Sequence, residues 1–121
     1  MPPLKEYGPK NPKNLIFVTN EKQIDDTKKN VKFIAASFCG YSQLGLGQLN
    51  AACDDISDEG KCYVFDLDDP KSRSVAEKLE IVPEAFPNHV ISDGKGNKKE
   101  FLGMLKTPDL RQKLRESGFK V

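Results

Sequence analysis

Several common sequence features are scarce in this chain of 121 residues, and each scarcity excludes a class of protein. No apolar run approaches the ~20 residues that a membrane-spanning helix needs, so we expect no membrane partner. The net charge is only +1, from 19 basic and 18 acidic residues. Such a balance gives nucleic acid no electrostatic reason to bind. The N-terminal residues also lack the apolar segment of a secretory signal peptide.

Cysteine is scarce as well. Three cysteines, an odd number, argue against a secreted disulfide framework and favour a reducing, cytoplasmic setting. The cysteines and the single histidine, His89, lack C-x-x-C or paired-ligand spacing, so we expect no metal site. Cys53 and Cys62 fall on an apolar helix face and in an apolar strand, which predicts two buried structural thiols. His89 is expected to be an ordinary strand residue, with lining of a cleft as the lesser alternative.

The length and the ordinary soluble composition predict one domain. Residues 1–13 hold four of the eight prolines and show no apolar period, which predicts an extended tail before a domain over 14–121. Apolar periodicity predicts the order β-α-β-α-β-α-β-β-α. The elements are strands at 15–18, 31–37, 62–67, 88–92 and 98–104, and helices over 20–29, after 39, from 70 and from 107. Strand–helix–strand units predict parallel pairing in a mixed sheet with helices on both faces.

Local signals support several of these boundaries. Asn20 followed by Gln23 forms a capping-box pattern. Asp69-Pro70 offers an N-cap residue with proline at the first helical position. The Asp-Gly-Lys-Gly-Asn segment at 93–97 predicts the turn of a hairpin.

Cys39 carries the strongest chemical signal in the sequence. It follows the apolar run at 31–36 and precedes a helical pattern, which places its thiol at a helix N-terminus. Unpaired backbone N–H groups and the helix dipole favour the thiolate there, with a pKa expected in the ~3.5–7.5 range of such settings. Ser42 stands where a C-x-x-C pair would have its second cysteine, and a hydroxyl cannot close a disulfide. The pattern therefore predicts one-thiol chemistry or none.

Four segments carry a family resemblance: Phe38-Cys39-Gly40-Tyr41-Ser42 after the second strand, Asp66-Leu67-Asp68 after the third, Phe86-Pro87-Asn88 before the fourth, and Gly103 after the last. In this order they resemble the thioredoxin family over about residues 15–121. The resemblance implies the thioredoxin fold, a central mixed sheet with helices on both faces. It also implies that Pro87, rather than its rival Pro83, is a cis-proline that turns the backbone of Phe86 toward Cys39.

The chain departs from that family in three places. Ser42 replaces the resolving cysteine, so the dithiol cycle is not available through this pair. Phe38 replaces the usual tryptophan. Phe33 lies where thioredoxins carry a buried acidic residue that serves the resolving thiol. The acidic residue and the resolving cysteine are thus absent together, as expected because neither has a function without the other.

The resemblance implies a monothiol redox protein that exchanges disulfides or forms a glutathione mixed disulfide. Cys39 would be the nucleophile and Ser42 would donate a hydrogen bond to it. The substrate groove would be formed by Phe38, Gly40, Tyr41, Phe86 and Pro87. Protein disulfides or glutathionylated proteins would be the partners, with glutathione as a possible co-substrate and no other cofactor. The sequence does not indicate an oligomeric state.

Two other functions remain open from the sequence. The first is a redox-inert module that keeps the cis-proline groove for binding peptides. The second follows from Cys-Gly-Tyr-Ser at 39–42, which resembles the C-G-F-S segment of monothiol glutaredoxins. That family shares an iron–sulfur cluster between two chains with the help of glutathione. This chain lacks the Gly-Gly turn of that family, so cluster binding is the lesser alternative.

Overall fold

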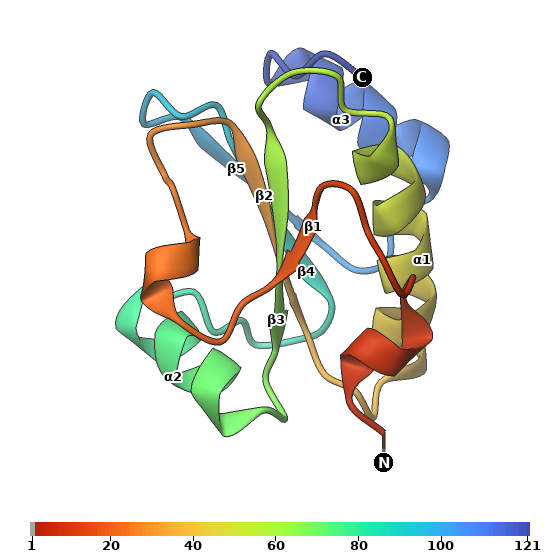
Figure 1. Cartoon of the computed structure of the whole chain (residues 1–121), viewed down its shortest axis with the longest axis vertical. Coiled ribbons are helices and arrows are strands. Elements are labelled where there is room, and N and C mark those ends of the chain that lie inside the picture. Colours follow the sequence, from red (N-terminus) through yellow and green to blue (C-terminus); the bar gives the residue numbers. More distant parts are fainter. Residues whose placement is uncertain (1) are drawn as a thin grey trace.

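The computed structural model describes residues 2–121, which contain a five-stranded sheet with helices packed on it (Figure 1). The strands are β1 (Leu15–Phe17), β2 (Asn30–Ala35), β3 (Lys61–Asp66), β4 (Asn88–Ser92) and β5 (Lys98–Leu102). The α-helices are α1 (Gly40–Asp54), α2 (Pro70–Lys78) and α3 (Thr107–Glu116). Two short 3-10 helices, η1 (Leu4–Tyr7) and η2 (Glu21–Gln23), complete the described elements. No helix within residues 2–121 has both the length and the apolar character required to cross a membrane.

The strands lie in the order β1-β3-β2-β4-β5. β3 pairs in parallel with both β1 and β2, as strand–helix–strand connections require. β4 runs antiparallel to β2, with Phe33 opposite His89. β5 returns antiparallel to β4 and forms one edge of the sheet. The predicted mixed sheet is confirmed.

Helices cover both faces of the sheet, and the period-2 alternation of the strands decides which side chain faces which helix. In β3, Cys62 and Val64 join the core beneath α1 and α3, whereas Tyr63 and Phe65 join the core beneath α2. Leu46 of α1 and the leucines of α3 fill the first core. Helices therefore cover both core layers of the sheet. The carboxyl ends of the parallel strands β2 and β3 lie at the same end of the sheet.

The hairpin between β4 and β5 has the predicted turn. Asp93 accepts hydrogen bonds from the backbone N–H of Lys95 and Asn97 through one carboxylate oxygen. Gly94 and Gly96 have positive φ values of 78° and 95°, which the residue type allows. β5 ends at Leu102, two residues earlier than predicted, because the next residue is a glycine with a φ of 94°.

The predicted helix over 20–29 is wrong beyond its first turn. The capping box at Asn20 and Gln23 is present, but the helix it opens is the short η2. Asp25 then accepts hydrogen bonds from both the backbone N–H and the hydroxyl of Thr27. Such local side-chain bonds compete with the helical pattern, and the chain continues as turns to β2.

The prediction of an extended tail over residues 1–13 is wrong for its middle part. Leu4 begins η1 and is fully buried in the core beneath α1. Its backbone N–H donates to a carboxylate oxygen of Asp66 at 2.9 Å. Met1 lies outside the described residues. Proline content favours an extended conformation locally, but burial of one leucine side chain and one strong hydrogen bond tie this segment to the domain.

Cys53 and Cys62 are buried as predicted, but they are not free thiols. They form a disulfide that joins the last turn of α1 to β3, with 6.4 Å between their Cα atoms. The packing of α1 over the start of β3 brings the two residues together across a sequence separation of 9. The odd number of cysteines had argued against a disulfide framework. Three cysteines are equally consistent with one disulfide and one free cysteine, which is what the structure contains.

Candidate active site

Cys39 is the N-cap residue of α1 and lies just beyond the carboxyl end of β2. Its carbonyl accepts the first helical hydrogen bond, from the N–H of Gln43 at 3.1 Å. The first turn of α1 contains no acidic side chain, so the partial positive charge of the helix N-terminus is not offset there. The Cys39 side chain is partly exposed, and it is the free cysteine of the described chain. The position is that of an accessible nucleophile.

A second segment of the chain lies against this cysteine. The Phe86–Pro87 peptide bond is cis. The carbonyl oxygen of Phe86 lies 4.0 Å from the Cys39 sulfur, although 47 residues separate the two in the chain. The Pro87 carbonyl in turn accepts a 2.8 Å hydrogen bond from the N–H of Gly103. The end of β5 therefore holds the proline segment in place opposite the thiol.

Hydrogen bonding lowers the pKa of the Cys39 thiol below its ordinary value. Partial burial raises this pKa, but hydrogen bonds to the sulfur outweigh that effect. The donors are the Ser42 hydroxyl and the backbone N–H groups of Ser42 and Tyr41, at the start of α1. These donors stabilise the thiolate relative to the thiol, so a larger share of Cys39 is ionised than of a cysteine with the ordinary pKa.

Ser42 is held in place from its other side. Its side chain is completely buried. The hydroxyl oxygen accepts a 3.2 Å hydrogen bond from the backbone N–H of Ala36, the residue that follows β2. A hydroxyl can accept one hydrogen bond and donate another at the same time, so the Ser42 hydroxyl can still donate to the Cys39 sulfur. Burial and the bond from Ala36 therefore fix the position of the serine hydroxyl.

Three large apolar side chains within five residues of Cys39 in the chain face solvent. Phe38, Tyr41 and Leu44 are 61%, 67% and 62% exposed. The sequence analysis predicted Phe38 and Tyr41 as groove residues and did not include Leu44, which lies three residues after Tyr41 on α1. Gly40 has neither a positive φ nor a close neighbour, since a Cβ atom there would meet nothing within 4 Å. The backbone thus sets no requirement for glycine at position 40.

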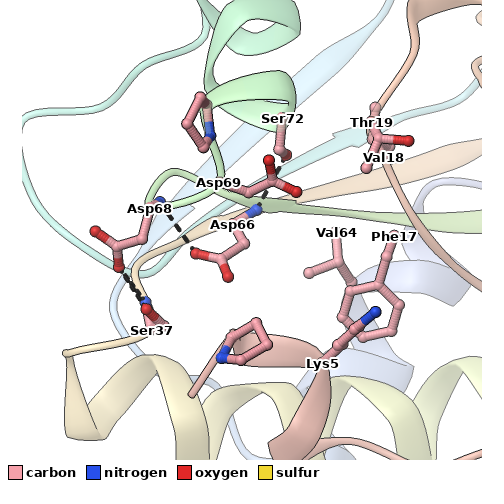
Figure 2. A pocket seen from close by; sticks show the side chains of 12 residues that line it. Lys5, Phe17, Val18, Thr19, Ser37, Val64, Asp66, Asp68, Asp69 and Ser72 are labelled. Carbon is pink, nitrogen blue, oxygen red and sulfur yellow. Dashed lines mark hydrogen bonds between the residues drawn. The ribbon is translucent and has the colours of Figure 1, made fainter. Parts of the chain in front are cut away.

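Aspartates at the end of β3 anchor the backbone that leads to Cys39. One carboxylate oxygen of Asp68 accepts from both the backbone N–H and the hydroxyl of Ser37, at 2.8 and 2.6 Å. Asp66 accepts from the N–H of Asp68 at 3.1 Å. Figure 2 shows these bonds side by side. In the sequence, Asp66 and Asp68 were noted only as part of a family pattern. In the structure they hold the backbone at Ser37, two residues before Cys39, in place.

The same aspartates line a cavity of about 520 Å³ between η1 and the start of α2 (Figure 2). Lys5 and Phe17 lie on the side of η1 and β1, and Asp69 lies on the side of α2. Ser37 belongs to the wall as well, only two residues before Cys39. One oxygen of Asp69 already accepts the N–H of Lys71 as the cap of α2.

His89 does not reach this surface. Its side chain is fully buried, and its ring packs edge-on against Phe33 with 5.0 Å between centroids. Nδ1 lies 3.2 Å from the Phe101 carbonyl oxygen, and Nε2 has no hydrogen-bond partner among residues 2–121. Burial lowers the pKa of His89 to about 4, so the imidazole is neutral at pH 7. His89 is a core residue of β4 rather than part of a cleft. No group of three or more His, Cys, Asp or Glu side chains within the described residues could hold a metal ion.

Comparison with solved structures identifies the architecture. The chain superposes on chloroplastic thioredoxin z with a TM-score of 0.71 at 14% identity, over 87% of this chain and 95% of that one. A mutant thioredoxin from Halobacterium salinarum NRC-1 gives 0.69 at 16% identity, over 94% and 99%. Thioredoxin from Trypanosoma brucei brucei gives 0.66 at 18% identity, over 88% and 93%. This chain has the thioredoxin fold.

At these identities the likeness establishes the fold and not the activity. A scan against models of known protein families gives no match, and a search of curated protein sequences gives none either. What this chain does with the thioredoxin fold must therefore be argued from its own site. The fold brings Cys39, Ser42 and the Phe86–Pro87 segment together, and it places Phe38 and Tyr41 at their border.

Proposed function

We propose that this protein exchanges disulfide bonds with partner proteins through one nucleophilic thiol, that of Cys39. One observation carries the proposal: a partly exposed sulfur at the N-terminus of α1 lies 4.0 Å from the Phe86 carbonyl, beside the cis-proline. The lowered pKa of Cys39 supports it, because the thiolate is the attacking species.

The exchange is balanced without any further reagent. The Cys39 thiolate attacks one sulfur of the partner's disulfide, a new S–S bond forms between the two chains, and the other partner sulfur leaves as a thiolate. An extended substrate segment would lie along the backbone of Phe86, in the manner of an added strand. Phe38 and Tyr41 would cover the apolar part of that segment.

Resolution of the mixed disulfide requires a thiol from outside the chain. Ser42 has no sulfur to offer. Cys53 lies 14 residues after Cys39 on α1, about 21 Å along the helix axis at 1.5 Å per residue, and its sulfur is bonded to Cys62. Glutathione, or a thiol of the partner other than the one just released, would attack the mixed disulfide and release Cys39 in the reduced form. The first route makes glutathione a co-substrate.

Mass spectrometry after treatment with oxidised glutathione tests the reactivity of Cys39. We expect one added glutathione per chain, mapped to Cys39, and none in the Cys39→Ser variant. Insulin reduction with thioredoxin-like turnover by the unaltered chain would contradict a monothiol cycle. Absence of any adduct would contradict the nucleophile itself.

A redox-inert binding module is the competing function, and the exposed side chains of Phe38, Tyr41 and Leu44 favour it. The two functions differ in the titration of Cys39. Iodoacetamide alkylation measured against pH gives the apparent pKa. A value at or above the ~8.5 of free cysteine favours the binding module, and a lower value favours thiol exchange.

A further inference from the structure

A groove on the α2 side of the sheet is lined by residues that flank the cis-proline segment in the chain. It has a volume of about 460 Å³ and lies between the loop that follows α2 and the end of β5. Asn88 lies within it, at the start of β4. The remaining lining residues are those of the loop and of the β5 edge: Glu80, Ile81, Val82, Pro83, Glu84, Ala85, Glu100 and Leu102.

The charged residues of this groove all have one sign. Glu80, Glu84 and Glu100 are exposed, and no lysine or arginine lines the groove. None of the three forms an ion pair with another residue between positions 2 and 121. Three unpaired carboxylates around one depression create a local negative potential, although the whole chain carries a net charge of +1.

The backbone holds this acidic loop in a defined shape. Glu80 has a φ of 57°, in the left-handed region, and reverses the chain at the end of α2. The N–H of Ile81 donates back to the Ala76 carbonyl at 3.1 Å, which closes the helix end. The loop is therefore fixed at its first residues, and the carboxylates are displayed by a structured turn.

Apolar side chains lie between the carboxylates. Val82 is 40% exposed and Leu102 is 63% exposed, on opposite sides of the groove. Lysine and arginine side chains have an aliphatic stem with a charged end, and they bury the stem on apolar surface while the end stays with opposite charge. An apolar groove with acidic borders is complementary to such side chains.

The groove borders, along the chain, the segments that face the thiol. Ala85 belongs to the groove, and the next residue, Phe86, places its carbonyl 4.0 Å from the Cys39 sulfur. On the opposite side, Leu102 is followed by Gly103, whose N–H is bonded to the Pro87 carbonyl. The groove therefore begins one residue before Phe86 in the chain, close enough for a segment that reacts at Cys39 to reach it.

We infer that the partner of Cys39 is a protein segment with a lysine or arginine, accompanied by an aliphatic residue, close to its reactive cysteine. The inference rests on the proposed thiol exchange and adds its substrate class. Glutathione carries more carboxylates than ammonium groups, so the acidic groove disfavours it relative to a basic peptide. The cavity on the other flank of the site contributes Asp66, Asp68 and Asp69 against the single Lys5, which extends the same negative field.

Three peptides that differ only beside one cysteine test the charge preference. Each carries lysine, glutamine or glutamate next to that cysteine, which is joined in a mixed disulfide to thionitrobenzoate. Attack by Cys39 forms the Cys39–peptide bond and releases the coloured thiolate, whose absorbance gives the rate. The rate of each peptide with β-mercaptoethanol corrects for its intrinsic reactivity. We expect the lysine peptide to react about tenfold faster than the glutamate peptide at low ionic strength, and the ratio to fall toward one in high salt.

A matched pair of double variants locates the preference. Glu84→Gln with Glu100→Gln removes two charges from the groove. Glu59→Gln with Glu116→Gln removes two exposed charges at the other end of the molecule, where both residues line a separate depression near Lys28. The ratio of the lysine-peptide rate to the glutamate-peptide rate should fall severalfold in the Glu84→Gln/Glu100→Gln variant. It should stay unchanged in the Glu59→Gln/Glu116→Gln variant. All four side chains are exposed, so both pairs are expected to fold.

The outcomes separate the inference from the proposed function. Equal corrected rates for the three peptides, or an equal fall of the ratio in both variant pairs, would overturn the basic substrate class while leaving Cys39 as a nucleophile. If Cys39 also fails to react with the uncharged 2-hydroxyethyl disulfide, the proposed thiol exchange is overturned, and the substrate class with it.

Discussion

The Cys39 sulfur lies 4.0 Å from the Phe86 carbonyl oxygen, across 47 residues of sequence. A thiol donates to a carbonyl oxygen at this place, whereas a thiolate has no proton to donate. Ionisation of Cys39 therefore leaves the Phe86 carbonyl oxygen without this donor. The Ser42 hydroxyl and the backbone N–H groups at the start of α1 remain as donors that stabilise the negative charge of the sulfur.

Removal of the Ser42 hydroxyl should raise the pKa of Cys39. The Ser42→Ala variant loses the side-chain donor to the sulfur, so less thiolate is present near pH 6–7 and alkylation by iodoacetamide slows there. The variant also leaves the buried Ala36 N–H without its acceptor, at a cost of about 1–3 kcal/mol in unfolding free energy. Alkylation rates from pH 4 to 10 give the pKa directly.

Gln43→Ala is the matched control for that measurement. It removes a 2.8 Å hydrogen bond from the Gln43 side chain to the Ser37 carbonyl, in the same loop, but no donor to the sulfur. The Cys39 titration should stay at its wild-type position in this variant. A similar upward shift in both variants would show that loop order, not the hydroxyl, controls the thiol.

Conversion of Ser42 to cysteine should create a dithiol site. The Ser42→Cys variant places a second sulfur on the side of Cys39 where the serine hydroxyl now donates. An intramolecular disulfide then resolves the mixed disulfide, so insulin reduction with turnover should appear only in the variant. Thiol counts after mild oxidation provide a second readout, with a loss of two thiols per chain expected. A variant that keeps both thiols under oxidation would contradict the placement of Ser42.

The disulfide between Cys53 and Cys62 should stabilise the fold measurably. A closed loop of this length corresponds to about 2–3 kcal/mol in the chain-entropy treatment. Urea unfolding of the Cys53→Ala/Cys62→Ala variant should show a loss of that size, while Cys39→Ser, at a partly exposed position outside the bridge, should unfold near wild type. Thiol titration of the denatured, unreduced chain should give one thiol. Three thiols would show that the bridge is absent in solution.

Burial of His89 should make the protein less stable in mild acid. Its pKa falls from 6.5 to about 4 on folding, so the unfolded chain binds the proton more tightly between these values. The contribution to stability is complete above pH 6.5 and is lost as the pH falls toward 4, for a total on the order of 3 kcal/mol. Urea unfolding at several pH values from 7.5 to 4.5 measures the slope.

His89→Leu tests the origin of that slope. Leucine keeps an apolar contact with Phe33 but has no titrating group, so the variant should lose much of the pH dependence between 6.5 and 4.5. The variant also leaves the Phe101 carbonyl without its side-chain partner, which affects stability at all pH values alike. An unchanged slope would assign the acid sensitivity to other groups.

Local sequence determined the elements whose signals act over a few residues. The capping box at Asn20, the Asp69-Pro70 helix start and the 93–97 turn all form as predicted, because each depends on backbone groups within one turn of the chain. The buried strands followed from apolar runs, and the order of elements predicted a mixed sheet. The helix over 20–29 was overpredicted, since Asp25 and Thr27 satisfy each other locally.

The sequence by itself determined that one accessible cysteine stands at a strand end before a helix, with a serine three residues later. Only the tertiary structure decided which distant residues contact that cysteine and which do not. Packing of distant segments placed the Phe86 carbonyl against its sulfur, joined Cys53 to Cys62, and buried Leu4 beside Asp66. Such pairings depend on how two helical layers close over one sheet, a property of the whole chain that no local pattern encodes.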